Sequence, residues 1–249
     1  MYFPPENRHN RKSRKFGLVV LQDNSTGFFF TLLPDARQSV TLDALPKRPI
    51  EMARLFLSQD LNDRAIGLGA INAISQFFFK QCKFNPPDAL NPLGNFDFKK
   101  SDHVGMVGFF PALVKKLRKQ QIPLTVIELD KQLVQQDEEF TVTLDVSQLA
   151  QCNKILCTAS TLINDTVDEI LNHCKAAEQV ALLGPSTGCF PDPLFEKGIS
   201  VIGGSVVNDY ALLEQRCNDD IDWSGTVTKY ALTKDTYPGF KALAQGIKL

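Results

Sequence analysis

The chain has 249 residues, 43% of them hydrophobic and 22% charged, and its net charge is −1 at pH 7. This composition is ordinary for a soluble globular protein with a sizeable core, and the near-neutral charge excludes a general attraction to nucleic acid or membranes. No apolar run approaches the roughly 18 residues of a membrane span, and no secretory signal is visible, so we expect a cytoplasmic protein.

The first fifteen residues differ in charge from the rest. Residues 1–15 hold five basic side chains against Glu6, a net charge of +4, which leaves −5 for the remainder. We interpret this segment as a flexible, solvated basic tail. The alternative is an arm that binds nucleic acid or another anionic surface.

The segment after the tail predicts a small α+β domain, residues 16–90. Two β-rich runs flank the turn formers DNSTG within residues 16–33, which predicts a hairpin. Residues 50–58 predict a short helix. A longer helix, capped by Asn62 or Asp63, follows and is apolar nearly all round, so we expect it to be buried on more than one side.

Three residues inside the longer helix carry further predictions. Gly67 and Gly69 each weaken a helix by about 1 kcal/mol relative to alanine, which indicates that another backbone approaches closely there. Asn72 is one of the few polar residues in this helix. It is either a structural hydrogen-bonding group or a residue that faces a cleft.

Residues 83–100 divide the chain. This stretch, KFNPPDALNPLGNFDFKK, contains three prolines and three asparagines. Because they break any periodicity, we place a domain boundary between residues 90 and 91. Beyond it, apolar strand-like runs alternate with amphipathic helices. The alternation predicts a parallel sheet covered on both faces, an α/β, Rossmann-like domain over residues 91–249.

The elements expected in this second domain can be written as sequence. The expected strands are HVGMVGFF, PLTVIELD, KILCTASTLI, QVALLG and ISVIGG. The expected helices are PALVKKLRKQ, DTVDEILNHC and YALLEQRC, with a short helix after the loop PSTGCFPD. The remainder, from Trp223 onward, predicts a further strand and a terminal helix.

The expected carboxyl ends of these strands all carry small or polar residues. They are Gly108, Glu128, Thr158 with Ser160 and Thr161, the loop at 184–188, and residues 203–205. In an open parallel sheet, ligands bind in the crevice outside such ends. Turn formation alone explains any one loop, but five on one edge favour a binding site. The hydroxyls and N–H groups of the GPSTG loop would suit an anionic or metal-bound ligand.

The first strand and turn match a dinucleotide-binding loop poorly. Gly105 and Gly108 do not complete the G-x-G-x-x-G fingerprint, and Pro111 removes an N–H that could bind an anion. Standard NAD or FAD binding is therefore disfavoured. Glu128 and Asp130, however, lie where a ribose-binding acid falls in such domains. The cysteine and histidine spacings predict no structural zinc site.

Several segments together resemble a known family. They are AIGLGAINAI, VGMVGFFPALVKKL, VIELD, TASTLINDTVDEIL and LLGPSTGCFPDPLFEKGISVIGGSVVND. They are similar to the family described as "putative heavy-metal chelation", over about residues 16–215. The resemblance implies an enolase N-terminal-like domain joined to a Rossmann-like domain, with a site in the cleft between them. It also implies heavy-metal chelation, or the handling of a metal-bound small molecule.

Carried over by motif, the resemblance implies a set of ligand-binding positions. They are Asn72, Gly108, Phe109, Phe110, Glu128, Thr161, Asn164, Gly184, Pro185, Ser186 and Thr187. Glu128 is the candidate carboxylate for a ribose hydroxyl or for the heavy or transition metal ion that the family implies. Ser186 and Thr187 would hold an anion, and Asn72 would reach in from the other domain. No residue is assigned a catalytic role.

Three functions remain open from the sequence. The first is binding of a small anionic or metal-chelating ligand in the interdomain cleft. The second is an enzyme that uses a nucleotide-type cofactor, such as S-adenosylmethionine, in the same cleft. The third is a non-catalytic interaction protein. The 18 phenylalanines, with FFF runs at 28–30 and 77–79, would then supply a homo-oligomer surface.

Overall fold

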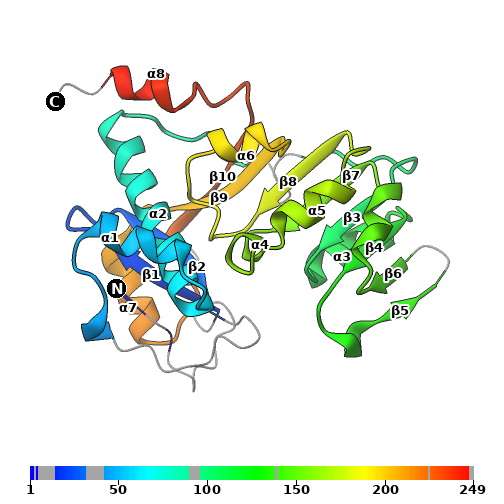
Figure 1. Ribbon diagram of the computed structural model, residues 1–249, viewed down its shortest axis with the longest axis horizontal. Helices are drawn as coiled ribbons and strands as arrows, with labels where there is room; N and C mark the ends of the chain where they lie inside the picture. The colour runs from blue at the N-terminus through cyan, green and yellow to red at the C-terminus, as the bar shows by residue number, and fades with distance from the viewer. Residues whose placement is uncertain are drawn as a thin grey trace.

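Two β-sheets and one long helix organise the protein (Figure 1). The computed structural model describes residues 1–2, 4, 15–31, 42–89, 96–137, 140–223 and 225–246. In Figure 1 the hairpin and helix α2 stand at the left, and the large sheet runs from β10 beside them to β5 at the far right. Among the described residues, no helix is long and apolar enough to cross a membrane.

The N-terminal elements match the predicted hairpin and helices. Strands β1 and β2 pair antiparallel, with Phe16 opposite Phe30. Helix α2 is capped by Asp60, whose carboxylate accepts the N–H groups of Asn62 and Asp63, so the predicted cap at those two residues is wrong. The bounds are β1 Phe16–Val20, β2 Thr26–Phe30, α1 Pro49–Arg54 with a 3₁₀ turn Leu55–Leu57, and α2 Leu61–Gln81.

The glycines of this region permit close backbone contacts, as predicted for α2. A Cβ added to Gly67 would lie 2.1 Å from the backbone nitrogen of Phe56. One added to Gly27 of β2 would lie 2.0 Å from the carbonyl oxygen of Gly69. The hairpin therefore packs directly on the α2 backbone, and larger residues would force the two elements apart.

Two predictions fall mainly outside the described residues. Most of the basic tail, residues 3 and 5–14, lies outside them. Tyr2 lies within them and forms an antiparallel bridge with Leu18, so it extends the hairpin. The proposed domain boundary falls within residues 90–95, which are also outside the described ranges. The division into two domains therefore stays a prediction.

The large sheet has the strand order β10-β9-β8-β7-β3-β4-β6-β5. The strands from β9 to β6 pair parallel, and β10 and β5 are antiparallel at the two edges. This parallel-rich α/β sheet confirms the predicted fold class. The strand bounds are β3 Val104–Val107, β4 Leu124–Ile127, β5 Gln135–Gln136, β6 Phe140–Thr143, β7 Lys154–Thr158, β8 Gln179–Leu183, β9 Val201–Val207 and β10 Val227–Leu232.

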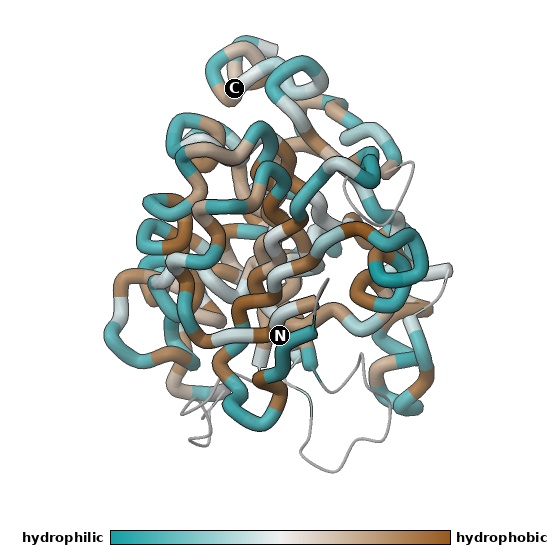
Figure 2. The backbone as a smooth tube through the Cα atoms, turned by 90° about the vertical axis from the view of Figure 1, so that its right-hand side faces the viewer, coloured by the Kyte–Doolittle hydropathy of each residue, from teal (hydrophilic) through white to brown (hydrophobic). Residues whose placement is uncertain are grey.

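Helices cover both faces of this sheet. Val114 and Leu117 of α3 pack on one face with Met106 and Val126. Helices α2, α4, α5 and α6 contribute to the apolar cluster on the other face. Figure 2 shows the apolar segments gathered in the interior and the hydrophilic ones at the outer turns. The helix bounds are α3 Pro111–Lys119, α4 Ser160–Ile163, α5 Val167–His173, α6 Asp192–Glu196, α7 Tyr210–Asn218 and α8 Phe240–Gln245.

Two parts of the second region differ from the sequence prediction. The expected strand KILCTASTLI ends at Thr158, and Ser160–Ile163 forms the short helix α4. The Thr161 hydroxyl donates to the Thr158 carbonyl at 2.7 Å, and such local bonds compete with strand pairing. Strands β5 and β6 were not predicted; β5 is only two residues long, and both residues are exposed.

The phenylalanine runs lie largely in the core. Phe28, Phe29 and Phe79 are at most 2% exposed. Phe77 is 39% exposed and is the outward member of the second run. Both runs therefore serve mainly to pack the hairpin, α2 and their neighbours. A homo-oligomer surface built on them stays a prediction.

Candidate functional site

Asn72 joins three elements in the interior. Its side chain is 1% exposed, and Nδ2 donates to the carbonyls of Phe28 and Ser186, both at 2.8 Å. One bond holds β2 and the other holds the loop after β8. Gly188 of that loop packs against the same side chain, because a Cβ added there would lie 2.9 Å from Asn72 Cβ. The structure thus places Asn72 against the GPSTG loop, as a buried hydrogen-bond donor.

Replacing Asn72 with alanine is expected to lower the free energy of unfolding by about 2–3 kcal/mol, because two buried carbonyl oxygens would lose their donor. Denaturant unfolding monitored by circular dichroism measures the change. Gln81→Ala, an exposed position on the same helix, is the control and should change stability by no more than about 0.5 kcal/mol. Equal effects of the two substitutions would contradict a structural role for the Asn72 amide.

The hydroxyls of the GPSTG loop are buried. Ser186 is 1% exposed and Thr187 is 0% exposed. Thr187 Oγ1 donates to the Gly184 carbonyl at 2.6 Å, so it closes the turn, whereas Ser186 Oγ has no partner in the described chain. Tyr230 Oη donates to the Thr187 carbonyl at 3.1 Å. Burial raises the pKa of Tyr230, so the phenol stays protonated and can donate at neutral pH.

Glu128 organises the turn after β3. Its carboxylate accepts the N–H of Phe109 at 2.8 Å through Oε2 and the N–H of Leu129 at 2.7 Å through Oε1. Gly108 precedes Phe109 in this turn and has φ +86°. A Cβ added to it would lie 3.1 Å from Thr158 Cγ2. The predicted residues of the β3 and β4 ends thus lie together, and Gly108 contacts the end of β7, the neighbour of β3 at which the strand order reverses. The hydrogen bonds of Glu128 hold the loop after β3 against the loop after β4.

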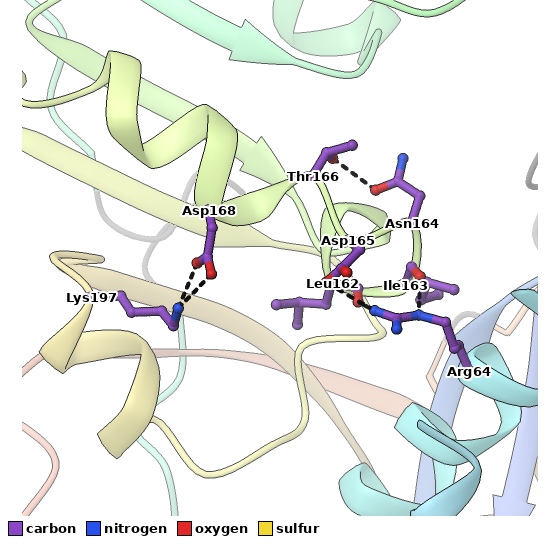
Figure 3. A network of polar contacts seen from close by, with 8 residues as sticks. All are labelled: Arg64, Leu162, Ile163, Asn164, Asp165, Thr166, Asp168 and Lys197. Carbon is purple, nitrogen blue, oxygen red and sulfur yellow. Dashed lines mark hydrogen bonds and ion pairs between the residues drawn. The ribbon is translucent and has the colours of Figure 1, made fainter. Parts of the chain in front are cut away.

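Helix α4, which contains Thr161, and the following Asn164 lie at a second junction with α2, and Figure 3 shows Asn164 there. Arg64 of α2 donates to the carbonyl of Ile163 at 2.7 Å, and its guanidinium lies 3.1 Å from an Asp165 oxygen. Asn164 extends toward Thr166, with 2.8 Å between the two side chains. Turned so that its nitrogen faces Thr166, the amide would also donate to the Thr161 carbonyl. These contacts fix the end of α4 against α2.

A cavity of about 510 Å³ lies beside the end of β8 and the middle of β9. Its volume is within the range of small-molecule sites. Leu183 and the strand pair β9–β10 form its floor, and the first turn of α3 forms one wall. We call it the β9 cavity. Its aromatic lining consists of Phe16, Phe28, Phe110, Trp223 and Tyr230.

The aromatic residues of the hairpin side form a contiguous wall. The Trp223 ring lies 5.1 Å from that of Phe28 and 5.9 Å from that of Phe16, measured between centroids. Trp223 is 3% exposed, and its buried Nε1–H has no acceptor among the described residues. This wall brings the segment after α7 together with both strands of the hairpin.

Polar groups enter the β9 cavity at a few points. Ser205 and Lys229 are direct partners on the antiparallel strands β9 and β10, so their side chains share one face. Ser205 is 6% exposed, and its hydroxyl has no hydrogen-bond partner in the described part of the chain. Lys229 is exposed. These groups, with the N–H of Ala112 at the start of α3, are hydrogen-bond donors that suit an anion.

Three of the predicted site residues, Phe110, Gly184 and Pro185, line the β9 cavity. The others are not part of its lining and lie in the junctions just described: Asn72, Gly108, Phe109, Glu128, Thr161, Asn164, Ser186 and Thr187. Residues 203–205 also line the cavity, but β9 continues to Val207, so the prediction that they form the carboxyl end of this strand is wrong. Sequence reasoning missed Trp223 and Lys229, because neither lies near a recognised motif.

A second, more polar cavity of about 910 Å³ lies on the other side of β9. Its lining includes Asp23, Gln76, Lys83 and Asn208. No sequence motif pointed to it. Within the described ranges, no group of three or more His, Cys, Asp or Glu side chains is arranged to hold a metal ion.

Comparison with known proteins places the chain in a family. An uncharacterized protein of Methanocaldococcus jannaschii is 27% identical over 203 residues, which are 78% of this chain and 76% of that protein. Two crystal structures of DUF364-family proteins of unknown function share the fold. The Pyrococcus horikoshii protein has a TM-score of 0.67 at 21% identity, covering 88% of each chain. The Desulfitobacterium hafniense protein has a TM-score of 0.66 at 19% identity, covering 93% of each.

The family model described as "Putative heavy-metal chelation" matches residues 91–219. The match therefore includes the β3–α3 turn and the GPSTG loop, two of the segments that border the β9 cavity. On this match the chain belongs to that family, which is also called DUF364.

Proposed function

We propose that this protein binds a small anionic or metal-chelating ligand in the β9 cavity. The observation that carries the proposal is the Ser205 hydroxyl, which is 6% exposed, lines the cavity and has no partner among the described residues. The hydroxyl is therefore open to the cavity, where a ligand oxygen can take the hydrogen bond that it otherwise makes to water.

The composition of the lining supports the same proposal. Ligand sites are mostly apolar, with a few polar groups that fix orientation. The β9 cavity has this character, because aromatic and aliphatic side chains surround Ser205 and Lys229. The family description adds heavy-metal chelation. A metal would then enter as cargo, carried by a chelating anion that these donors can bind.

The division into an enolase N-terminal-like domain and a Rossmann-like domain is part of the proposal. Residues 16–90 would form the first domain and residues 91–249 the second. Phe16 and Phe28 come from the first and the remaining lining residues mostly from the second, so the β9 cavity would be an interdomain cleft.

Native mass spectrometry of the protein purified without chelators tests the proposal. We expect a mass excess over the denatured chain that is lost in Ser205→Leu, because the larger side chain would occupy the cavity. Val206→Leu is the matched control, since the adjacent residue of β9 points to the opposite face and should keep the ligand.

A ligand that remained bound to Ser205→Leu would show that the β9 cavity is not the site. The mass of the excess also separates the chemical classes. A metal or metal-bearing molecule would support the chelation function, and an adenosyl compound would instead indicate a nucleotide-type cofactor. If the wild-type chain carried no excess, titration with small-molecule extracts can be followed by the fluorescence of Trp223, the single tryptophan of the chain.

A further inference from the structure

The donors of the β9 cavity come from two parts of its lining. Ser205 and Lys229 lie side by side on the floor formed by β9 and β10. The start of α3, from Phe110 to Leu113, forms the wall. Lys229 makes no ion pair with a described residue. A positive side chain and a free hydroxyl therefore meet at the same end of the cavity.

The first turn of α3 borders the cavity and offers it one N–H, that of Ala112, because Pro111 has none and the Leu113 N–H donates to the Phe110 carbonyl. No side chain caps it at Phe110, its first turn contains no acidic residue, and its basic residues are in the last turn. The helix has nine residues, and the amide of Ala112 lacks an acceptor within the helix. The N-terminus of a helix carries a partial positive charge that favours an anion. Ser205, which is 6% exposed, lines the cavity and makes no side-chain hydrogen bond to a described residue, points independently to a ligand at this place.

The rest of the lining is suited to a flat apolar group. The rings of Phe16, Phe28 and Trp223 form one side, and Leu183 lies on the floor. A ring stacked or packed edge-on against such a wall gains contact area and aromatic interactions. A small inorganic anion would leave this wall without a partner.

Resting on the function proposed above, we propose that the ligand is an aromatic acid. Its carboxylate binds between the Ala112 amide, the Ser205 hydroxyl and the Lys229 ammonium, and its ring packs on the wall of Phe16, Phe28 and Trp223. Such acids with a neighbouring hydroxyl also chelate metal ions, which connects this ligand class to the family description. The cavity of about 510 Å³ accommodates a molecule of one or two rings.

The test compares 2-naphthoate with 2-naphthamide, which has the same shape without the charge. Isothermal titration calorimetry gives the affinities, and the one indole N–H resonance of Trp223 reports whether the β9 cavity is occupied. We expect 2-naphthoate to shift that resonance and to bind at least about tenfold more tightly than the amide, because a charge-assisted hydrogen bond is lost in the amide.

Variants assign the preference to residues. Lys229→Met keeps the apolar stem and should weaken 2-naphthoate about tenfold without changing 2-naphthamide. Ser205→Ala should weaken 2-naphthoate about fivefold, since it removes one hydrogen bond. Lys234→Met, an exposed lysine outside the cavity, is the matched control and should have no effect.

Equal affinity of the acid and the amide would overturn the inference, as would an unchanged acid preference in Lys229→Met. Failure of the inference is distinguishable from failure of the proposed site. If the amide shifts the Trp223 resonance as strongly as the acid and Ser205→Leu abolishes both shifts, the cavity binds ligands but not acids. If neither probe shifts the resonance, while Ser205→Leu still releases the natural ligand, the aromatic acid is again excluded and the site remains.

Discussion

Asp102→Ala is expected to lower the free energy of unfolding by about 3–5 kcal/mol, because it leaves a buried ammonium without its partner. Asp102 lies just before β3 and is 4% exposed. Lys154 Nζ lies 3.0 Å from its Oδ2, and both side chains are less than a tenth exposed. The Lys99 N–H donates at 2.7 Å and the Asn153 amide at 3.0 Å. Lys154 also donates to the Asp97 carbonyl, which cannot neutralise its charge.

Denaturant unfolding of two further variants isolates the contribution of burial. Asp168 pairs with Lys197 at 2.6 Å, but the two side chains are 64% and 48% exposed, so Asp168→Ala should change stability by less than about 1 kcal/mol. The double variant Asp102→Leu with Lys154→Met removes both charges and should recover most of the loss. If Asp102→Ala lowered the free energy of unfolding no more than Asp168→Ala, the buried ion pair of Asp102 and Lys154 would not stabilise the protein.

The same pair gives a pH dependence of stability. Burial of Asp102 raises the pKa of its carboxyl, but the hydrogen bonds from Lys99, Asn153 and Lys154 outweigh it, and the net pKa is lowered. A carboxyl whose pKa is lower in the folded than in the unfolded chain stabilises the protein at pH values above its unfolded-state pKa, which is about 4. This stabilisation is lost as the pH falls through the folded-state pKa. We expect the Asp102→Ala chain to lose less stability than the wild type between neutral pH and pH about 3.

The sequence predicted the fold class because local signals agreed with the tertiary structure. The buried strands β3, β4, β7 and β8 are continuous apolar runs, and the helices between them are amphipathic, so periodicity identified them. The same method missed β5, which is two exposed glutamines, and it extended β7 through α4. Strand β5 forms by pairing at the edge of the sheet, and the bond from the Thr161 side chain to the backbone favours α4 over a longer β7. Neither interaction produces a hydrophobic periodicity in the sequence.

The sequence predicted only those residues of the candidate site that directly follow a strand. Gly184, Pro185 and Phe110 follow β8 and β3 directly, so the parallel topology brings them to one edge. Lys229 and Trp223 reach the β9 cavity through the antiparallel β10 and the segment before it, whose register the sequence does not specify. The burial of Ser186 and Thr187 depends on Asn72, more than a hundred residues away in the chain. Pattern reading does not capture such long-range contacts.

Phe29→Ala is the second substitution expected to have a large effect, a loss of about 3–5 kcal/mol in the free energy of unfolding. Phe29 is 0% exposed and its ring lies between two glycines. A Cβ on Gly17 of β1 would lie 2.1 Å from Cζ of this ring, and one on Gly69 of α2 would lie 2.6 Å from Cδ1. The ring thus fills a space that the glycines leave between the hairpin and α2. Phe77→Ala, on the exposed side of α2, should change stability by less than about 1 kcal/mol.

A double-mutant cycle distinguishes this packing from a general loss of apolar area. Gly69→Ala alone should destabilise the protein, because the clash with the Phe29 ring outweighs the gain of about 1 kcal/mol in helix propensity. In the Phe29→Ala background the ring is absent, so the added methyl group should be neutral or stabilising. We expect a coupling energy of at least about 1 kcal/mol from denaturant unfolding of the four chains. Additive effects would mean that α2 and the hairpin are held together by contacts other than the Phe29 ring in its glycine-lined space.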